Sequence, residues 1–112
     1  MLYRISTQSS GAYVVTIVGP KVLFEDEKFK VWDLQLEPGE ALGMHRHTRD
    51  YLLVFIGESR IRGVNPDGTT CFEQDMHDGD VFQRVIDDAD DVHDAVNVGD
   101  TLSLNIIIEM KS

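Results

Sequence analysis

Three of the four histidines in the chain are spaced as metal ligands would be. His45 and His47 are two residues apart, and on a β-strand this spacing places both imidazoles on the same face. His93 belongs to a later strand-like segment. Two imidazoles from one strand and a third from another can hold a divalent metal ion, and imidazole suits zinc, iron, nickel and copper alike. The spacing therefore predicts a mononuclear metal site without choosing the metal.

The segments that must position these histidines read as short strands separated by turn residues. Within residues 29–36, Trp32, Leu34 and Leu36 fall on one face, and the nearly continuous apolar run at 51–56 predicts a strand buried on both sides. The sequence from Asn65 to Gly68 is a strong turn signal. The predicted strands are 13–18, 29–36, 51–56, 61–64, 69–74, 81–86, 92–98 and 101–109. This spacing, with no convincing helix, predicts an all-β sandwich or small barrel.

Length and composition limit the class of protein further. A chain of 112 residues is typical of one domain, and 20 Asp and Glu against 10 Lys and Arg give a net charge of −10. That charge repels nucleic acids and anionic membranes and attracts divalent cations, so we expect no nucleic-acid or membrane partner. The single cysteine, Cys71, excludes an intramolecular disulfide and suits a reducing compartment. With no apolar run approaching the ~18 residues of a spanning helix and no signal-peptide pattern, we expect a cytoplasmic protein.

The glycines and histidines together resemble the two motifs of the cupin superfamily. The first family motif runs Gly, five residues, His-x-His, three or four residues, Glu, six residues and Gly; the second ends in His, three residues and Asn. The matching residues here are Gly39, His45, His47, Asp50, Gly57, His93 and Asn97. The resemblance covers about residues 22–109 and extends to small single-domain cupins, including those assigned to β-alanine degradation. It implies a double-stranded β-helix (jelly-roll) barrel, with residues 1–112 forming one cupin domain and 1–20 an N-terminal strand region.

The resemblance implies that His45, His47 and His93 are metal ligands, and it leaves the fourth position open. The family's Glu is absent: Asp50 stands too close to His47, and Tyr51 occupies the Glu spacing. Strict alternation from His47 would put Tyr51 on the histidine face and Asp50 on the other, unless a turn or bulge rotates Asp50 inward. Asp50 is therefore one candidate for the fourth ligand. Tyr51 is a competing occupant of the same corner and a candidate catalytic proton donor.

Two further side chains are candidates for binding a substrate. Arg49 falls on the histidine face by the same alternation, where its guanidinium would clamp a substrate carboxylate through two hydrogen bonds. By resemblance, Asn97 would lie deeper than His93 on the same strand face and orient the bound molecule. The expected cofactor is one divalent ion, Fe, Mn, Ni or Zn.

Two functions fit this set of residues. The first is a metal-dependent enzyme acting on a small organic molecule, of the dioxygenase type or using the metal as a Lewis acid in an isomerase or lyase. The alternative is a non-catalytic module that binds or senses a metal or small ligand, which suits a chain with no obvious lid to exclude water. The resemblance also implies a homodimer. The apolar segment 13–18 would pair with a second subunit or form a strand of its own barrel, and the two readings are equally weighted.

Overall fold

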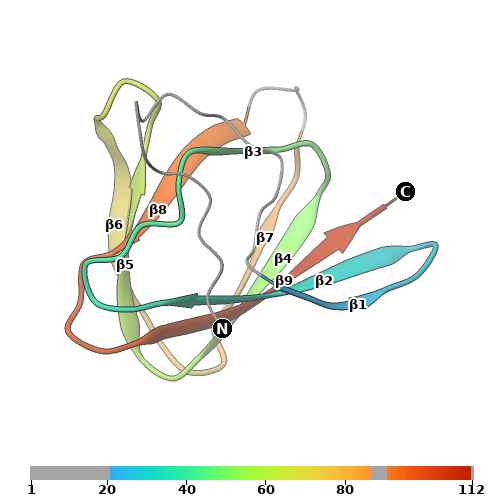
Figure 1. Cartoon of the computed structure of the whole chain (residues 1–112), viewed down its shortest axis with the longest axis horizontal. Coiled ribbons are helices and arrows are strands. Elements are labelled where there is room, and N and C mark those ends of the chain that lie inside the picture. The colour runs from blue at the N-terminus through green and yellow to red at the C-terminus, as the bar shows by residue number, and fades with distance from the viewer. Residues whose placement is uncertain (1–20, 87–90, 112) are drawn as a thin grey trace.

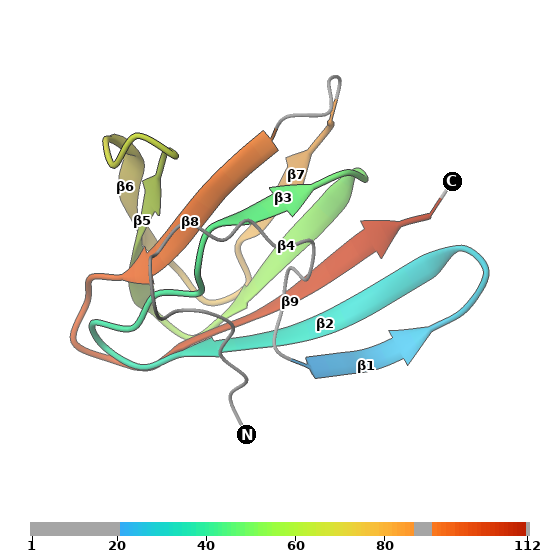
Figure 2. The same ribbon diagram turned by 45° about the horizontal axis from the view of Figure 1, so that its top comes forward.

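Nine β-strands run through residues 21–86 and 91–111, the parts of the chain that the computed structural model describes. Their bounds are β1 Lys21–Glu25, β2 Phe29–Leu36, β3 His45–His47, β4 Tyr51–Ile56, β5 Ser59–Val64, β6 Thr70–Met76, β7 Val81–Arg84, β8 Asp91–Asn97 and β9 Ser103–Met110. They form two antiparallel sheets, one in the order β1-β2-β9-β4-β7 and one in the order β3-β8-β5-β6 (Figures 1 and 2). The described residues contain no helix that could cross a membrane. The predicted all-β class is confirmed, whereas the predicted strand at 13–18 lies outside the described residues.

The core lies between the two sheets, and its first layer is the one the sequence predicts. Trp32, Leu34 and Leu36 on β2 are all at least nine-tenths buried, because alternate residues of a strand face the same side. They pack with Leu42, Tyr51 and Ile107. A second cluster, which consists of Phe55, Ile61 and Met76, continues the core along the barrel.

The predicted burial of 51–56 on both sides is wrong for the outer side. On β4, Tyr51 and Phe55 face the interior and are 2% and 3% exposed, whereas Ile56 is 47% exposed. The intervening residues 52–54 are only partly buried. The apolar run therefore covers one core face and also places apolar side chains on the outer face of the sheet.

Strand β9 has polar residues on the face that points into the barrel and apolar residues on the outer face. Its inward positions include Ser103, Asn105 and Glu109, all buried, while Leu104 and Ile106 point outward and are half-buried. Buried polar groups need hydrogen-bond partners. Glu109 accepts a hydrogen bond from the indole N–H of Trp32 (2.8 Å), and the Ser103 hydroxyl donates to that of Ser59 (3.3 Å).

The turn predicted at Asn65–Gly68 is confirmed and joins β5 to β6. The amide of Gly68 donates to the Asn65 carbonyl (2.9 Å), and Asn65 donates to the Thr69 carbonyl (2.8 Å). Gly68 has φ +89°, a backbone conformation that glycine adopts at little steric cost. By contrast β1, which the sequence pattern did not predict, has five exposed residues and is defined by its pairing with β2.

Candidate metal centre

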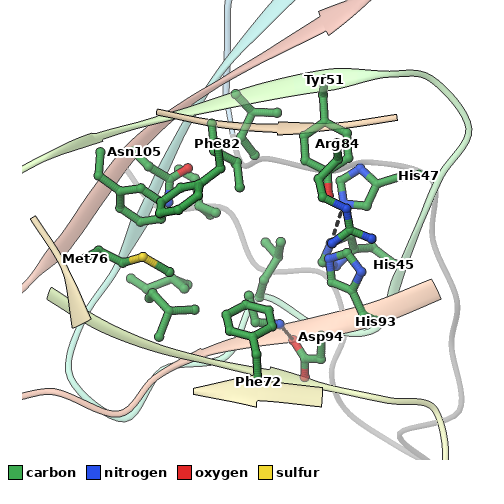
Figure 3. Close-up of a pocket in the computed structure, with 18 of the residues that line it drawn as sticks. His45, His47, Tyr51, Phe72, Met76, Phe82, Arg84, His93, Asp94 and Asn105 are labelled. Atoms are coloured by element: carbon green, nitrogen blue, oxygen red, sulfur yellow. Dashed lines mark hydrogen bonds between the residues drawn. The ribbon is translucent and has the colours of Figure 1, made fainter. Parts of the chain in front are cut away.

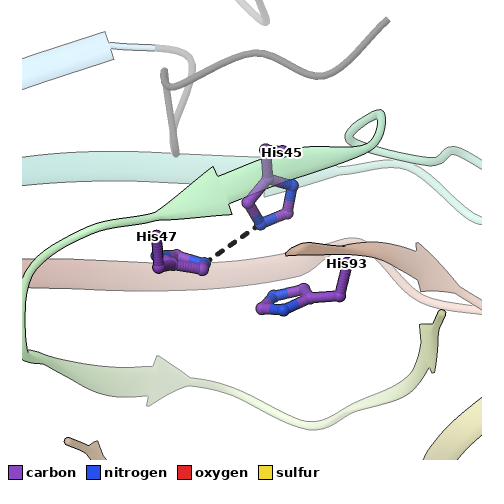
Figure 4. Close-up of side chains that lie close together, drawn as sticks. All are labelled: His45, His47 and His93. Atoms are coloured by element: carbon purple, nitrogen blue, oxygen red, sulfur yellow. Dashed lines mark hydrogen bonds between the residues drawn. The ribbon is translucent and has the colours of Figure 1, made fainter. Parts of the chain in front are cut away.

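The three predicted histidine ligands come together at one corner of the barrel. His45 and His47 project from β3, and the register of β3 with β8 places His45 directly opposite His93. One ring nitrogen from each lies within 4.8 Å of the others (Figure 4). The Nε2 atoms of His45 and His47 are 3.1 Å apart. Two nitrogens bound to one metal at ~2.1 Å lie about 3.0–3.4 Å from each other, so this pair already has the spacing of metal ligands.

Hydrogen bonds behind two of the rings orient their Nε2 atoms towards the common centre. His45 Nδ1 donates to the carbonyl of Gly43 (2.8 Å), and the amide of Gly43 donates to Asp94 Oδ1 (2.8 Å). Gly43 has φ +109°, which favours glycine at this position. His93 Nδ1 donates to Asp91 Oδ1 (3.1 Å). Metal-binding histidines have this type of second hydrogen bond, because it holds the tautomer whose other nitrogen is free to bind the ion.

The ring nitrogens of His47 also suit a bound cation. His45 uses its Nδ1–H for Gly43, so its Nε2 presents a lone pair to the Nε2 of His47. The Nδ1 atom of His47 is buried and has no hydrogen-bond partner within the described parts of the chain. The 3.1 Å contact is a hydrogen bond when His47 carries its proton on Nε2; with that proton on Nδ1, both Nε2 lone pairs would be available to a divalent cation between the rings. The residues present thus fit a bound metal ion.

Burial keeps two of these imidazoles neutral. Removal from water and, to a smaller extent, the neighbouring His93 lower the pKa of His45 from 6.5 to about 4. Burial, with His45 and His93 nearby, lowers the pKa of His47 to about 2. Since only the neutral imidazole binds a metal, both rings are in the binding form at neutral pH.

Tyr51 occupies the corner beside the histidines. It begins β4, is 2% exposed, and stacks on His47 with ring centroids 4.1 Å apart and an interplanar angle of 18°. Burial, together with the negative charge of Asp91, raises the pKa of its phenol well above the usual value. The phenol therefore stays protonated and is a hydrogen-bond donor in the pocket.

Asp50 lies outside the histidine cluster. The group that could hold a metal consists of His45, His47 and His93, and the Asp50 carboxylate instead accepts a hydrogen bond from the amide of Ile86 (2.8 Å). Its carbonyl accepts another from Met110 (2.9 Å). The physical reason is that β3 ends at His47, so Asp50 sits in the connection to β4 and caps a neighbouring loop. The structure thus favours Tyr51 as the occupant of the fourth corner.

The arginine that reaches the pocket differs from the one that alternation suggests. Arg49 is exposed and is not among the residues that line the pocket, because the strand stops before it. Arg84 on β7 lines the pocket instead, since it pairs in register with Tyr51. Its Nη2 is 3.4 Å from Asp91, the carboxylate that also binds His93. Alternation along β7 could have indicated that Arg84 and Phe82 share a face.

The structure gives Asn97 a different environment from the one expected of a substrate-binding group. Its side chain has no exposed surface, and its amide donates to the carbonyls of Leu36 and Thr101 (2.8 Å each). Its Oδ1 accepts a hydrogen bond from Gly99 (2.9 Å), and it does not line the pocket. The hydrogen bonds of Asn97 therefore connect the loop after β8 to the end of β2.

A mainly apolar pocket of about 230 Å³ opens beside the three histidines. In Figure 3 the histidines, Arg84 and Tyr51 gather at one end, and Met76 and Asn105 lie at the opposite end. Leucine, isoleucine and phenylalanine side chains form most of the wall between them. This arrangement suits a small molecule with one polar end at the histidines and an apolar body.

Comparisons with solved structures define the class of protein. A cupin domain from Bordetella pertussis Tohama I superposes with a TM-score of 0.72 at 25% identity, over 89% of this chain and 98% of that one. An RmlC-like cupin with a double-stranded β-helix fold from Methanocaldococcus jannaschii gives a TM-score of 0.60 at 14% identity, over 80% and 76% of the two chains. The resemblance to the cupin superfamily is confirmed, and the chain has the double-stranded β-helix barrel of a small cupin. No protein-family model matches the sequence, and no curated protein matches it either.

Some structures with the same fold are named as enzymes. A cupin-superfamily sugar phosphate isomerase from Silicibacter pomeroyi gives a TM-score of 0.54 at 22% identity over 77% of this chain. The polyketide cyclase RemF from Streptomyces resistomycificus gives 0.56 at 15% identity over 78% of this chain. The chain spans 52% and 57% of their lengths. At these identities the likeness shows the shared fold alone.

Proposed function

We propose that this cupin binds one divalent metal ion through His45, His47 and His93 and holds a small organic molecule beside it for a metal-dependent reaction. One observation carries the proposal: three imidazoles, two of them fully buried and neutral, converge at the end of an apolar pocket. A bound Fe, Mn, Ni or Zn ion would act as a Lewis acid on a ligand oxygen or, if redox-active, activate O₂. Enzymes among the proteins of the same fold are consistent with catalysis.

The chain's own residues have complementary tasks in this proposal. The apolar walls bind the carbon skeleton and exclude water, which strengthens electrostatic interactions at the histidine end. The Tyr51 phenol, held protonated by burial, donates a hydrogen bond or a proton to a developing oxyanion. The guanidinium of Arg84 supplies a positive charge at the same end of the pocket for an anionic ligand group.

Replacing Arg84 with methionine is expected to weaken binding of small carboxylates by about 10- to 100-fold, the effect of losing one charge-assisted hydrogen bond. The measurement is a titration of Co²⁺-loaded protein with hexanoate, followed by the visible absorption of the metal. Arg49→Met is the matched control, because Arg49 is exposed and outside the pocket. Equal losses in the two variants would contradict the role of Arg84. Calorimetry that gives the same hexanoate affinity for the metal-free protein would instead support a metal-free binding module.

We also propose a homodimer, because the outer face of the five-stranded sheet is apolar. Val81 and Phe24 are 57% and 53% exposed, and the outward residues of β9 between them are half-buried leucine and isoleucine. Light scattering after size exclusion is expected to give twice the chain mass of 12.6 kDa. Phe24→Lys should shift the species towards one chain, and Thr70→Lys on the other sheet should not. A monomer at micromolar concentration would contradict the proposal. We propose separately that the protein is cytoplasmic, because its single cysteine suits a reducing compartment.

A further inference from the structure

Asn105 is a buried polar residue whose acceptor is left without a partner. It is 4% exposed, faces inward from β9 and lines the pocket, yet its Oδ1 has no hydrogen-bond partner among the residues that the structure describes. The other inward polar residues of this strand, Ser103 and Glu109, both have partners. Leaving a buried acceptor unpaired costs free energy, so an unpaired acceptor in the wall of a pocket indicates a group that a ligand completes.

Asn105 lies at the end of the pocket opposite the histidines (Figure 3). Tyr51, which stacks on His47, pairs with Glu109, whereas Phe55 pairs with Asn105. The two pairs are four residues apart along the strands, a separation of about 13 Å. Side chains at both ends shorten the space that a ligand must bridge.

The wall around Asn105 is apolar, so we expect the middle part of the ligand to be apolar as well. Phe55 and Phe82 pack edge to face with centroids 5.9 Å apart, and Met76 lies beside them. These side chains can pack against methylene groups or a ring. The pocket, at about 230 Å³, is smaller than the ~300–1,000 Å³ of typical ligand sites, which limits the occupant to a small molecule.

We infer that the pocket takes a bifunctional small molecule with a carboxylate or similar oxygen at the histidine and Arg84 end, an apolar middle, and a hydroxyl or N–H group that donates to Asn105. This inference rests on the proposed function for the orientation of the ligand. Asn105 is the specificity residue for the distal group. A site built to receive a hydrogen bond rejects an analogue that lacks the donor, since the buried oxygen is then left unpaired. A second carboxylate at the distal end is rejected as well, because its charge would be buried among Phe55, Phe82 and Met76 without a cation to pair with it.

The test compares hexanoate, 6-hydroxyhexanoate and adipate by calorimetry, with the corresponding acids of four to eight carbons to match the length of the pocket. At the best length, the hydroxy acid is expected to bind about 10-fold more tightly than the plain acid, and the diacid more weakly than either. Asn105→Leu, which is close in volume, should remove the preference for the hydroxyl and leave the plain acid unaffected. Ser103→Ala is the matched control and should preserve the preference.

Three results would overturn the inference. The first is an equal preference in Asn105→Leu, and the second is no binding of any acid in the series. The third is a lower melting temperature of ligand-free Asn105→Leu, which would show that the amide oxygen stabilises the fold; we expect an unchanged or higher one. The metal is assayed separately by Co²⁺ titration. Asn105-dependent selectivity in protein that binds no Co²⁺ would refute the proposed function and leave this inference standing.

Discussion

Replacing His45 with alanine is expected to lower the affinity for divalent metal ions by at least about 100-fold. Losing a residue that only supports a ligand already costs 10- to 100-fold, and His45 is placed as a ligand itself. Its Nε2 lies 3.1 Å from that of His47, and its Nδ1 is held by the Gly43 carbonyl, so the ring is fixed in the position of a metal ligand. The measurement is a competition between the protein and a chromophoric chelator for Zn²⁺ or Co²⁺.

His77 provides the matched control for this experiment. It is exposed and pairs with Glu58 (2.8 Å), far from the cluster that could hold a metal. His77→Ala should retain the affinity of the parent protein. If both variants lose affinity equally, or if neither does, the metal binds elsewhere on this strongly acidic surface.

The metal-free protein is expected to lose stability as the pH falls below 6.5. His45 and His47 are buried in neutral form, and their pKa values in the folded state are about 4 and about 2. In the unfolded chain each has the ordinary value of 6.5, so below this pH the unfolded state binds more protons and becomes favoured. Each histidine lowers the free energy of unfolding by about 1.4 kcal/mol per pH unit until the pH reaches its folded-state value.

Urea unfolding of chelator-treated protein between pH 7 and pH 4.5 measures this slope. His47→Leu should have a shallower slope by about one proton. His77→Gln is the control: Glu58 raises the pKa of His77, so this group contributes stability below pH 6.5 that is lost as the pH rises through its folded-state value. Its removal should not change the slope at acid pH, where both states are protonated. An identical slope in His47→Leu would show that His47 is protonated or solvated in the folded state.

The sequence predicted the barrel and the three histidines because both depend on local spacing. Alternation placed His45 and His47 on one face, and the pairing of β3 with β8 brought His93 opposite His45, beside both rings, as the motif match implied. The strands at 29–36 and 51–56 have the bounds expected, since apolar alternation and flanking turn residues define both.

The remaining features depend on where a strand ends and on what lies across the barrel. Alternation cannot be extended reliably past His47, where β3 ends: Arg49 does not take the position that it assigns, whereas Tyr51 and Asp50 lie on the sides that it assigns. Arg84 reaches the same corner from a strand distant in sequence. Sequence analysis did not single out Asn105, although Ser103, Asn105 and Glu109 stand at alternating positions of β9 and therefore share one face. In β9 the polar face points into the barrel, and the apolar residues on the other face are partly buried. The polarity of a strand therefore does not by itself show which face points inward.

The most direct test of the metal centre is the metal content of the purified chain, prepared without a histidine tag. Inductively coupled plasma mass spectrometry of the protein, as purified and after reconstitution with Fe²⁺, Mn²⁺, Ni²⁺ and Zn²⁺, would measure both the identity and the stoichiometry of the ion. We expect close to one ion per chain for at least one of these metals, retained through dialysis. Substoichiometric metal in every preparation would contradict a three-histidine metal centre and leave the pocket as a metal-free binding site.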